Sequence, residues 1–400
     1  MKIGVFLPDE NPVLGGTSTM LSAILSEIEE SNYLCDICVI YRGGLFDKLK
    51  SKKNNIEYIN INRFKLTIFL KYWIIQMTYH FKDFKERLWM RVPTKSMASY
   101  FDMLAKKEGI SLFWFTMPVC EILSTPYIFT VWDLGHRTLP MFPEMTNSTF
   151  EWDSREKMYQ RMLPRASYII TGNNSGKNEI VENYNIPADR IHTIEFMVPS
   201  LFRGDAIKPT VNLPELFFYY PAQFWAHKNH TLILEALKKL KDDYAITANV
   251  VFTGHDYGTK GYIENKARKL EVDKQVYILG FLELGEVKYL YQNARALVYP
   301  SLLGPNNLPP LEAIALGCPV LISDLVGHKE QLGDAAIFFD RYSADDLAQA
   351  MKNILDDSNR LMLLDKAKDY IEKKKNYSYT NEVIKIIQDF ETNMKRWKEV

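Results

Sequence analysis

The chain has 400 residues, among them 49 Lys or Arg against 49 Asp or Glu, 47% hydrophobic residues and 4 cysteines. The length fits two domains of ordinary size, and the zero net charge argues against nucleic acid as the main partner, since phosphate binding requires a basic excess. Few cysteines fit a reducing compartment, and no apolar run reaches the roughly 18 residues of a membrane-spanning helix. The sequence therefore predicts a globular protein that is dissolved or lies on a surface.

Short apolar runs alternate with longer helical patterns along the chain, which is typical of βαβ units around a parallel sheet. The opening run, 2–7, is too short for a signal peptide and predicts a buried first strand. Further strands are predicted at 35–41, 57–61, 112–115, 127–131, 168–170 and 190–194, and a second series at 216–221, 249–253, 275–280, 296–299, 320–323 and 335–338. A proline-rich stretch at 197–215 separates the two series. We therefore expect domains at 1–205 and 206–375, followed by a helix at 376–400.

Two cysteines, Cys35 and Cys38, have the spacing of a metal chelate. They fall in a predicted strand, where residues three apart point to opposite faces. We therefore expect two buried thiols rather than a metal site.

The segment 63–95 departs from this regularity because it carries eight Lys or Arg against two acids, a net charge of +6. Apolar side chains recur in it at steps of three and four: Leu70, Trp73, Met77, Phe81, Phe84 and Leu88. A basic amphipathic helix with aromatic side chains can lie in the headgroup layer of an anionic membrane, although it can equally pack on the domain core. The candidate membrane contacts are Lys82, Lys85, Arg87, Trp89 and Arg91.

Several familiar motifs are absent or incomplete. The segment 171–178, TGNNSGKN, resembles a phosphate loop, but three residues instead of four separate its glycines and Asn178 replaces the Ser or Thr that would hold magnesium. No G-x-G-x-x-G follows a strand and no D-x-D occurs. A dinucleotide oxidoreductase and a metal-dependent site are therefore not indicated.

The loop after the first strand contains Gly15 and Gly16 just before an apolar helix. Glycines at that place leave backbone amides bare at a helix N-terminus, an arrangement suited to an anion. A Gly-Gly turn alone is weak evidence for a site.

Lys228 stands where a helix beginning near Asn229 is predicted. A positive charge at a helix N-terminus is unfavourable by about 0.3–1 kcal/mol unless an anion lies there. The position therefore favours a phosphate clamp over a solvated surface lysine. His227 and His230 flank it, but two histidines without a third ligand are a weak metal site.

Two further loops follow predicted strands, where open α/β sheets bind ligands. Backbone groups at Phe281 and Leu282 could face a planar base. Asn306 and Asn307 lead into a short helix whose amides could hold a diphosphate or sugar, and Glu312 within it could accept hydrogen bonds from vicinal hydroxyls.

The Gly-Gly loop, HKNH at 227–230, GFL at 280–282, PSLLGPNNLPPLEAIALGCPVLISD at 300–324 and GDAAIFFD at 333–340 resemble the retaining glycosyltransferases of family 4, also called group 1 glycosyl transferases. The resemblance is most specific in the C-terminal half; in the N-terminal half it depends on the Gly-Gly loop, 130–144 and 165–180. It implies the α/β architecture called GT-B: two Rossmann-like domains facing a cleft, with the donor on the C-terminal domain, the acceptor on the N-terminal one and a last helix that crosses back.

The resemblance also implies site residues. Lys228 is expected to neutralise the leaving diphosphate, with Asp133 or His136 orienting the acceptor or the donor sugar. The implied donor-binding set is Gly15, Gly16, Gln223, Lys228, Asn229, Gly254, Phe281, Leu282, Asn306, Asn307, Leu308 and Glu312.

The chain departs from the family pattern at three positions. Gly304 occupies the place of an acid eight residues before Glu312, Gln223 replaces a basic residue five before Lys228, and Trp132 replaces a His before Asp133. The first two changes leave open how the donor sugar is held.

The resemblance implies transfer of a sugar from a nucleoside diphosphate sugar to a glycan or lipid-linked acceptor, with retention and without a metal or other cofactor. We expect this transfer to serve surface polysaccharide synthesis at the cytoplasmic membrane face. Two alternatives remain: a sugar-nucleotide epimerase or hydrolase on the same architecture, and a non-catalytic nucleotide-sugar-binding partner of another transferase. The sequence does not identify the sugar, base or acceptor.

Overall fold

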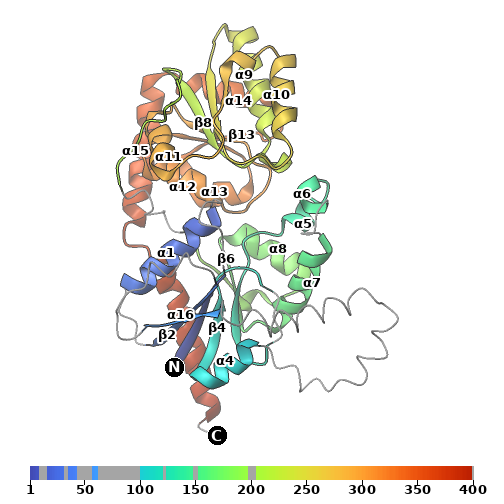
Figure 1. Cartoon of the computed structure of the whole chain (residues 1–400), viewed down its shortest axis with the longest axis vertical. Coiled ribbons are helices and arrows are strands. Elements are labelled where there is room, and N and C mark those ends of the chain that lie inside the picture. The colour runs from blue at the N-terminus through green and yellow to red at the C-terminus, as the bar shows by residue number, and fades with distance from the viewer. Residues whose placement is uncertain are drawn as a thin grey trace, which may run out of the picture.

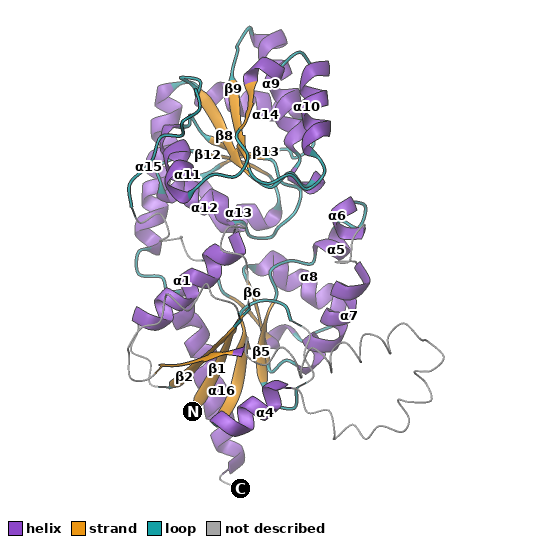
Figure 2. Cartoon of the chain, in the orientation of Figure 1, coloured by secondary structure: helices purple, strands orange, loops and turns teal. Residues whose placement is uncertain are grey.

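A computed structural model of the chain describes residues 1–8, 16–30, 35–42, 56–61, 100–119, 123–146, 152–196 and 204–398. These residues form two lobes, each built on a parallel sheet covered by helices (Figure 1, Figure 2). No helix within these ranges is both long and apolar enough to cross a membrane.

The N-terminal sheet has seven strands in the order β3-β2-β1-β4-β5-β6-β7. Its strands are β1 (Lys2–Leu7), β2 (Asp36–Tyr41), β3 (Ile56–Asn60), β4 (Ile110–Phe115), β5 (Tyr127–Thr130), β6 (Tyr168–Thr171) and β7 (Ile191–Thr193). The helices described with it are α1 (Gly16–Glu30), α4 (Tyr100–Glu108), α5 (Gly135–Thr138), α6 (Pro143–Thr146), α7 (Trp152–Met162) and α8 (Asn174–Tyr184), with 3-10 turns η4 (Leu163–Arg165) and η5 (Ala188–Arg190).

The C-terminal sheet has six strands in the order β10-β9-β8-β11-β12-β13. Its strands are β8 (Phe217–Pro221), β9 (Asn249–Thr253), β10 (Val276–Ile278), β11 (Leu297–Tyr299), β12 (Val320–Ser323) and β13 (Ile337–Phe339). The helices are α9 (His230–Tyr244), α10 (Lys260–Lys269), α11 (Leu284–Asn293), α12 (Leu308–Ala315), α13 (Val326–Leu332), α14 (Ala344–Ile354), α15 (Asp357–Lys374) and α16 (Tyr379–Lys398), with 3-10 turns η6 (Ala226–Lys228), η7 (Asp273–Gln275) and η8 (Gly333–Ala335).

All thirteen predicted strands are present, with ends within two residues of the predicted ones. The agreement has a physical reason: strands of a parallel sheet covered on both faces are continuous apolar runs, and β4 (ISLFWF), for example, buries every side chain except Ser111. Cys35 packs against one apolar cluster and Cys38 lies in another, so the two thiols do not converge. The expectation of two buried thiols is correct for Cys38 only, because Cys35 lies just before β2 and is half-buried.

The last helix, α16, leaves the C-terminal lobe and packs on the N-terminal one, where Figure 1 shows it running beside the first sheet. Tyr379 stacks on Trp114 with ring centroids 6.2 Å apart, and Tyr168 donates a 2.5 Å hydrogen bond to Asp389. Glu27 of α1 accepts a hydrogen bond from the Thr380 amide at 2.8 Å. The helix predicted to cross back is confirmed.

Two sets of sequence-predicted residues fall where the structure gives no description. Gly15 lies outside the described residues, and Gly16 is the residue at which α1 begins. The five candidate membrane contacts, Lys82, Lys85, Arg87, Trp89 and Arg91, also lie outside them.

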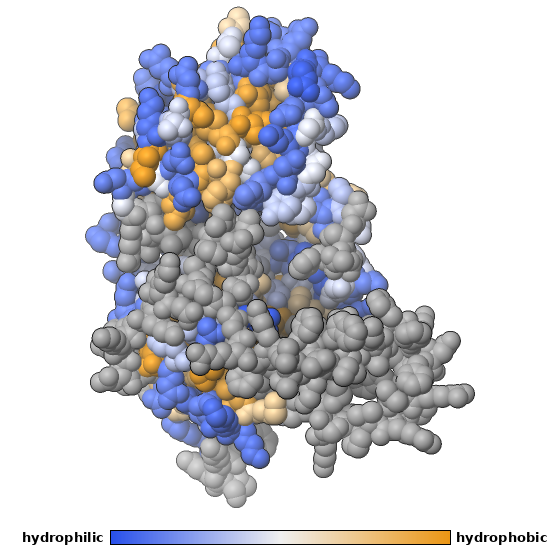
Figure 3. All heavy atoms as spheres, in the orientation of Figure 1, coloured by the Kyte–Doolittle hydropathy of each residue, from blue (hydrophilic) through white to orange (hydrophobic). Residues whose placement is uncertain are grey.

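On the face drawn in Figure 3, the C-terminal lobe shows apolar side chains bordered by hydrophilic ones.

Candidate functional site

The loops that follow the carboxyl ends of the strands in the two sheets meet between the lobes. The loop after β8 joins the loop after β11 through the Leu302 amide, which donates to the His227 carbonyl at 2.9 Å. From the other lobe, Gly135 touches Leu303 and Gly172 touches Asn306, so closely that a Cβ on either glycine would overlap the opposing side chain. The structure thus brings the candidates from both halves of the sequence to one place.

Lys228 ends η6, immediately before α9, whose N-cap Asn229 is left-handed with φ 55°. Its Nζ donates to the Tyr299 hydroxyl at 3.1 Å and lies 5.4 Å from the centre of that ring. No carboxylate of the described residues forms an ion pair with it. A lysine held by a neutral hydroxyl at a helix start keeps its charge available for an anion.

The start of α12 offers an anion fewer donors than the sequence predicts. The Asn307 amide donates to the Gln331 side-chain oxygen at 3.1 Å, and Gln331 returns a 2.9 Å bond to the Asn307 carbonyl. Pro309 and Pro310, in the first turn, have no N–H to give. Lys228 therefore carries more of any phosphate binding than the helix does.

Gly304, which stands where the family pattern has an acid, has φ 111°, a region that disfavours side-chain-bearing residues. A Cβ there would lie 2.7 Å from the side-chain nitrogen of Asn307, Nδ2. The acid is therefore excluded by the backbone of this loop, and replacing Gly304 by Glu would not restore it without moving the loop.

Asp133 follows β5 and faces the same region. Its Oδ1 accepts from the Gly135 amide at 2.8 Å and from Arg155 at 2.7 Å. Burial raises the pKa of Asp133, but Arg155 and the Gly135 amide outweigh burial and lower it. Asp133 is thus an oriented, ionised carboxylate that can accept a sugar hydroxyl.

One contact links the two lobes beside Lys228. The backbone N–H and Nδ1–H of His227 donate to Glu144 Oε1 at 2.8 and 2.5 Å. His230, in contrast, is buried against Phe224 and Tyr220. The two histidines do not converge, and no group of three potential metal ligands occurs among the described residues.

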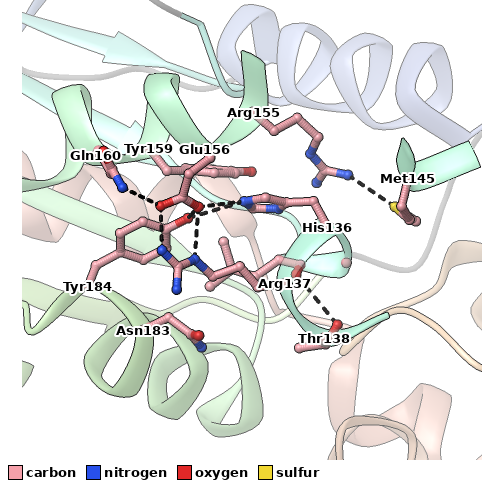
Figure 4. Close-up of polar contacts among 12 residues, drawn as sticks. His136, Arg137, Thr138, Met145, Arg155, Glu156, Tyr159, Gln160, Asn183 and Tyr184 are labelled. Carbon is pink, nitrogen blue, oxygen red and sulfur yellow. Dashed lines mark hydrogen bonds and ion pairs between the residues drawn. The ribbon is translucent and has the colours of Figure 1, made fainter. Parts of the chain in front are cut away.

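His136 is fully buried in a polar cluster (Figure 4). Its Nε2 lies 3.1 Å from Glu156, which also accepts from Arg137, Gln160 and Tyr184. Burial raises the pKa of Glu156, but these bonds outweigh it and lower the pKa to about 2. Burial also lowers the pKa of His136, which is neutral at pH 7 and has no exposed edge for a substrate.

The other candidate donor residues lie around the ends of β8, β9 and β10. Gln223 accepts a 2.6 Å bond from the His255 amide, and Phe281, exposed, stacks on His255 with centroids 4.9 Å apart. Gly254 has φ 143° and approaches the Ala222 carbonyl too closely for any side chain. Leu282 packs against the core, and Leu308 is buried. Phe281 with His255 forms an aromatic surface suited to a base.

Glu312 is turned into the domain, where it accepts a 2.8 Å bond from Tyr291. Burial raises its pKa to about 7, against the lowering effect of that bond. This carboxyl could serve a ribose only as a group that is partly protonated at neutral pH.

Sequence reasoning missed Tyr299, His328, Glu144 and Glu330. Glu330 accepts the amides of Asn174 and Ser175 at 2.9 Å each, so it caps α8 across the two lobes. These residues come from three separate elements and share no motif: Tyr299 ends β11, Glu144 lies in α6, and His328 and Glu330 lie in α13. Glu144 and Tyr299 lie at the edges of segments that the sequence singled out, 130–144 and 300–324, but nothing in those segments marked the two side chains themselves.

The comparisons with known proteins agree with this geometry. Residues 205–377 match the family model described as glycosyl transferases group 1. The O-antigen chain mannosyltransferase RfbU of Salmonella typhimurium is 28% identical over 231 residues, and the O-antigen chain mannosyltransferase B of Escherichia coli is 27% identical over 215. These alignments cover 55% and 51% of the chain but only 63% and 56% of the relatives.

Solved structures show the fold. Sucrose-phosphate synthase from Thermosynechococcus elongatus superposes with a TM-score of 0.68 at 15% identity, over 99% of both chains. WaaG, a glycosyltransferase involved in lipopolysaccharide biosynthesis, gives 0.61 at 14% identity over 96% of this chain and 99% of its own. The fold is therefore GT-B, as the resemblance implied.

Proposed function

We propose that this protein transfers a sugar from a nucleoside diphosphate sugar to a hydroxyl of a glycan or lipid-linked acceptor, with retention, in surface polysaccharide synthesis. The observation that carries the proposal is Lys228: a cation immediately before a 15-residue helix, held by the neutral hydroxyl of Tyr299. The family match of residues 205–377 supports it.

The sugar we propose is mannose. Two relatives bear the name O-antigen chain mannosyltransferase. The Anabaena protein HepE, which has a similar fold, was solved in complex with UDP. The identity of the donor's nucleotide base therefore has to be tested separately from the sugar. GDP-mannose and UDP-sugars are the donors to test first.

The chemistry requires stabilisation of charge on a leaving diphosphate. The bond between the anomeric carbon and the diphosphate oxygen breaks, the acceptor hydroxyl oxygen forms the new bond on the same face, and its proton passes to the leaving phosphate. A fixed cation aimed at the leaving group stabilises this charge as it develops. Lys228 supplies the cation, and Asp133 orients a sugar hydroxyl.

Transfer without a metal is part of the proposal. Its support is the Lys228 ammonium, which provides the positive charge that a divalent ion would otherwise supply. Transfer rates that stay within twofold after dialysis against EDTA are expected, and a loss restored by added Mg²⁺ or Mn²⁺ would contradict it.

Attachment to the inner face of the cell membrane is a further part. It is supported by the charge of +6 in 63–95. Vesicles containing 30% phosphatidylglycerol should carry the protein in flotation, and replacing Lys82, Lys85, Arg87 and Arg91 by Gln should release it. Unchanged flotation of that variant would exclude this segment as the contact.

The function is tested with purified full chain and a panel of nucleotides and nucleotide sugars. Ligands that bind only the folded state raise its midpoint of unfolding, and the binders then go into transfer assays with glycan and polyprenyl-linked acceptors. Sugar transfer supports the proposal. Turnover without acceptor would favour an epimerase or hydrolase. Binding without transfer would favour a non-catalytic partner, an alternative that is worth testing because Gly304 stands in place of the family's acid.

A further inference from the structure

A continuous chain of hydrogen bonds runs from Lys228 to Ser323 within the C-terminal domain. Lys228 Nζ bonds the Tyr299 hydroxyl at 3.1 Å, and this hydroxyl bonds Asn307 Oδ1 at 2.8 Å. Asn307 Nδ2 bonds His328 Nε2 at 2.7 Å, and His328 Nδ1 bonds the Ser323 carbonyl at 2.9 Å. Four separate elements, η6, β11, the α12 cap and α13, are thus joined through side chains.

The two ends of this chain fix its direction. An ammonium can only donate and a carbonyl can only accept. Tyr299 must therefore accept from Lys228 and donate to Asn307 Oδ1, which leaves Asn307 Nδ2 to donate to His328 Nε2. His328 then carries its proton on Nδ1. Reversing any one bond would place two donors or two acceptors against each other.

The members have no freedom to rearrange. Tyr299 is 1% exposed and His328 is 0% exposed. The Asn307 backbone is held on both sides by Gln331, and the Ser323 hydroxyl donates to the Ser301 carbonyl at 2.6 Å, which keeps it from donating to His328. Burial, together with the charge of Lys228, lowers the pKa of His328 to about 4, so the ring is neutral at pH 7.

We propose that Tyr299 and His328 are positioning residues for the transfer reaction: through Asn307 they hold the Lys228 ammonium at the place of the leaving diphosphate. The proposal rests on the proposed function. A lysine side chain has many rotamers, and a fixed acceptor at its tip reduces the entropy lost when it binds a phosphate. Bonds in series also polarise one another, which strengthens the hold on the ammonium.

The first test does not need a ligand. In full-length protein labelled with ¹⁵N-histidine, the His328 ring, assigned with His328→Gln, should show the Nδ1–H tautomer at pH 7. Tyr299→Phe should alter the His328 shifts although it does not touch that ring. An Nε2–H or charged ring in the wild type would overturn the proposal whatever the protein catalyses.

The second test separates positioning from folding. Tyr299→Phe should weaken binding of UDP or GDP, whichever the wild type binds, by about tenfold, the size of one lost hydrogen bond to a charged group. The nucleotide sugar should be affected less, because the additional charge appears only on the released diphosphate. Equal weakening of both ligands would indicate a general disturbance and overturn the proposal.

Matched variants complete the design. Tyr219→Phe removes an equally buried hydroxyl, which bonds Thr253 at 2.8 Å, and should leave diphosphate affinity within twofold. In a Lys228→Ala background, Tyr299→Phe should have no further effect on that affinity. His328→Gln, which keeps an acceptor for Asn307, should retain more affinity than His328→Leu.

The outcomes distinguish the two proposals. If the wild type shows the Nδ1–H tautomer but binds neither UDP nor GDP and transfers no sugar, the proposed function fails and the positioning role fails with it, while the bond chain itself stands. If the wild type transfers sugar and the double variant is additive, only the positioning role fails.

Discussion

Two polar networks lie at the ends of strands, one in each lobe, and they use charge in opposite ways. In the N-terminal network the carboxylate of Glu156 is surrounded by donors from Arg137, His136, Gln160 and Tyr184, so its charges cancel internally. In the C-terminal network the internal members are neutral and one cation, Lys228, stands at the end.

The difference separates a structural role from a binding role. In a buried pair that satisfies itself neither charge is left for a ligand, and removal of one partner destabilises the fold. Among the described residues, the side chain of Lys228 has a hydrogen bond to a neutral hydroxyl and no ion pair. Such a cation is already oriented, and its charge is not neutralised by a carboxylate of these residues. The resemblance pointed to both His136 and Lys228, and the packing around them favours Lys228 as the group that meets the substrate.

The largest effect is expected from the removal of Lys228, the charged residue at the end of the C-terminal network. Lys228→Ala should lower kcat/KM for transfer by about 100- to 1,000-fold, the usual loss when a charge-stabilising group is removed. The midpoint of unfolding should change little. Lys238→Ala, on α9, the helix that follows Lys228, and paired with Asp242, is the control and should behave as the wild type. Near-normal transfer by Lys228→Ala would remove the basis of the comparison.

The next largest effect is expected from neutralising Glu156, the carboxylate at the centre of the N-terminal network. Glu156→Gln should reduce the free energy of unfolding by about 3 kcal/mol, because Arg137 and His136 lose a buried charged partner. In the wild type this stabilisation exists above pH 4.5 and is lost as pH falls towards 2, since the folded pKa lies below the unfolded one.

Chemical denaturation at pH 7 and pH 3 measures this difference, which should shrink at the lower pH. Asp153→Asn, exposed on the same helix, should change stability by less than about 0.5 kcal/mol. Transfer activity per folded molecule should be kept in Glu156→Gln, and its loss would mean that the cluster acts in catalysis.

A smaller effect concerns Glu312, whose pKa burial raises to about 7. A raised carboxyl pKa means that the folded state holds the proton more tightly, so stability falls as pH rises from about 4.5 through 7. Glu312→Gln keeps an acceptor for Tyr291 and should raise the midpoint of unfolding by about 2–4 °C at pH 8 and not at pH 5. A shift of equal size at both pH values would contradict a buried, raised carboxyl.

The smallest effect tests the contact between the two regions. Glu144→Gln keeps a hydrogen-bond acceptor for His227 but removes the charge, so kcat/KM should fall by about two- to fivefold, the loss of about 0.5–1 kcal/mol. Nucleotide affinity should stay unchanged, because the contact between Glu144 and His227 joins the two lobes to each other and does not involve the nucleotide. Weaker nucleotide binding would place Glu144 in the donor site.

The sequence predicts what is local. Apolar runs predict every strand, and the position of Lys228 at a helix start predicts an anion site, since both depend on neighbours along the chain. The Glu156 cluster joins residues 20 and 28 positions apart, and the partners of Lys228 come from three later elements. The left-handed backbone at Gly304 was also beyond prediction, because a glycine permits that conformation without requiring it.

The crossing of α16 has a consequence for how the protein is made. Residues 205–377 can complete their sheet and helices as soon as they leave the ribosome, but the N-terminal domain, although synthesised first, lacks Tyr379 against Trp114 and Asp389 against Tyr168 until α16 emerges. The domain that is translated first is therefore completed after its partner domain, and its sheet lacks these contacts throughout the synthesis of that domain.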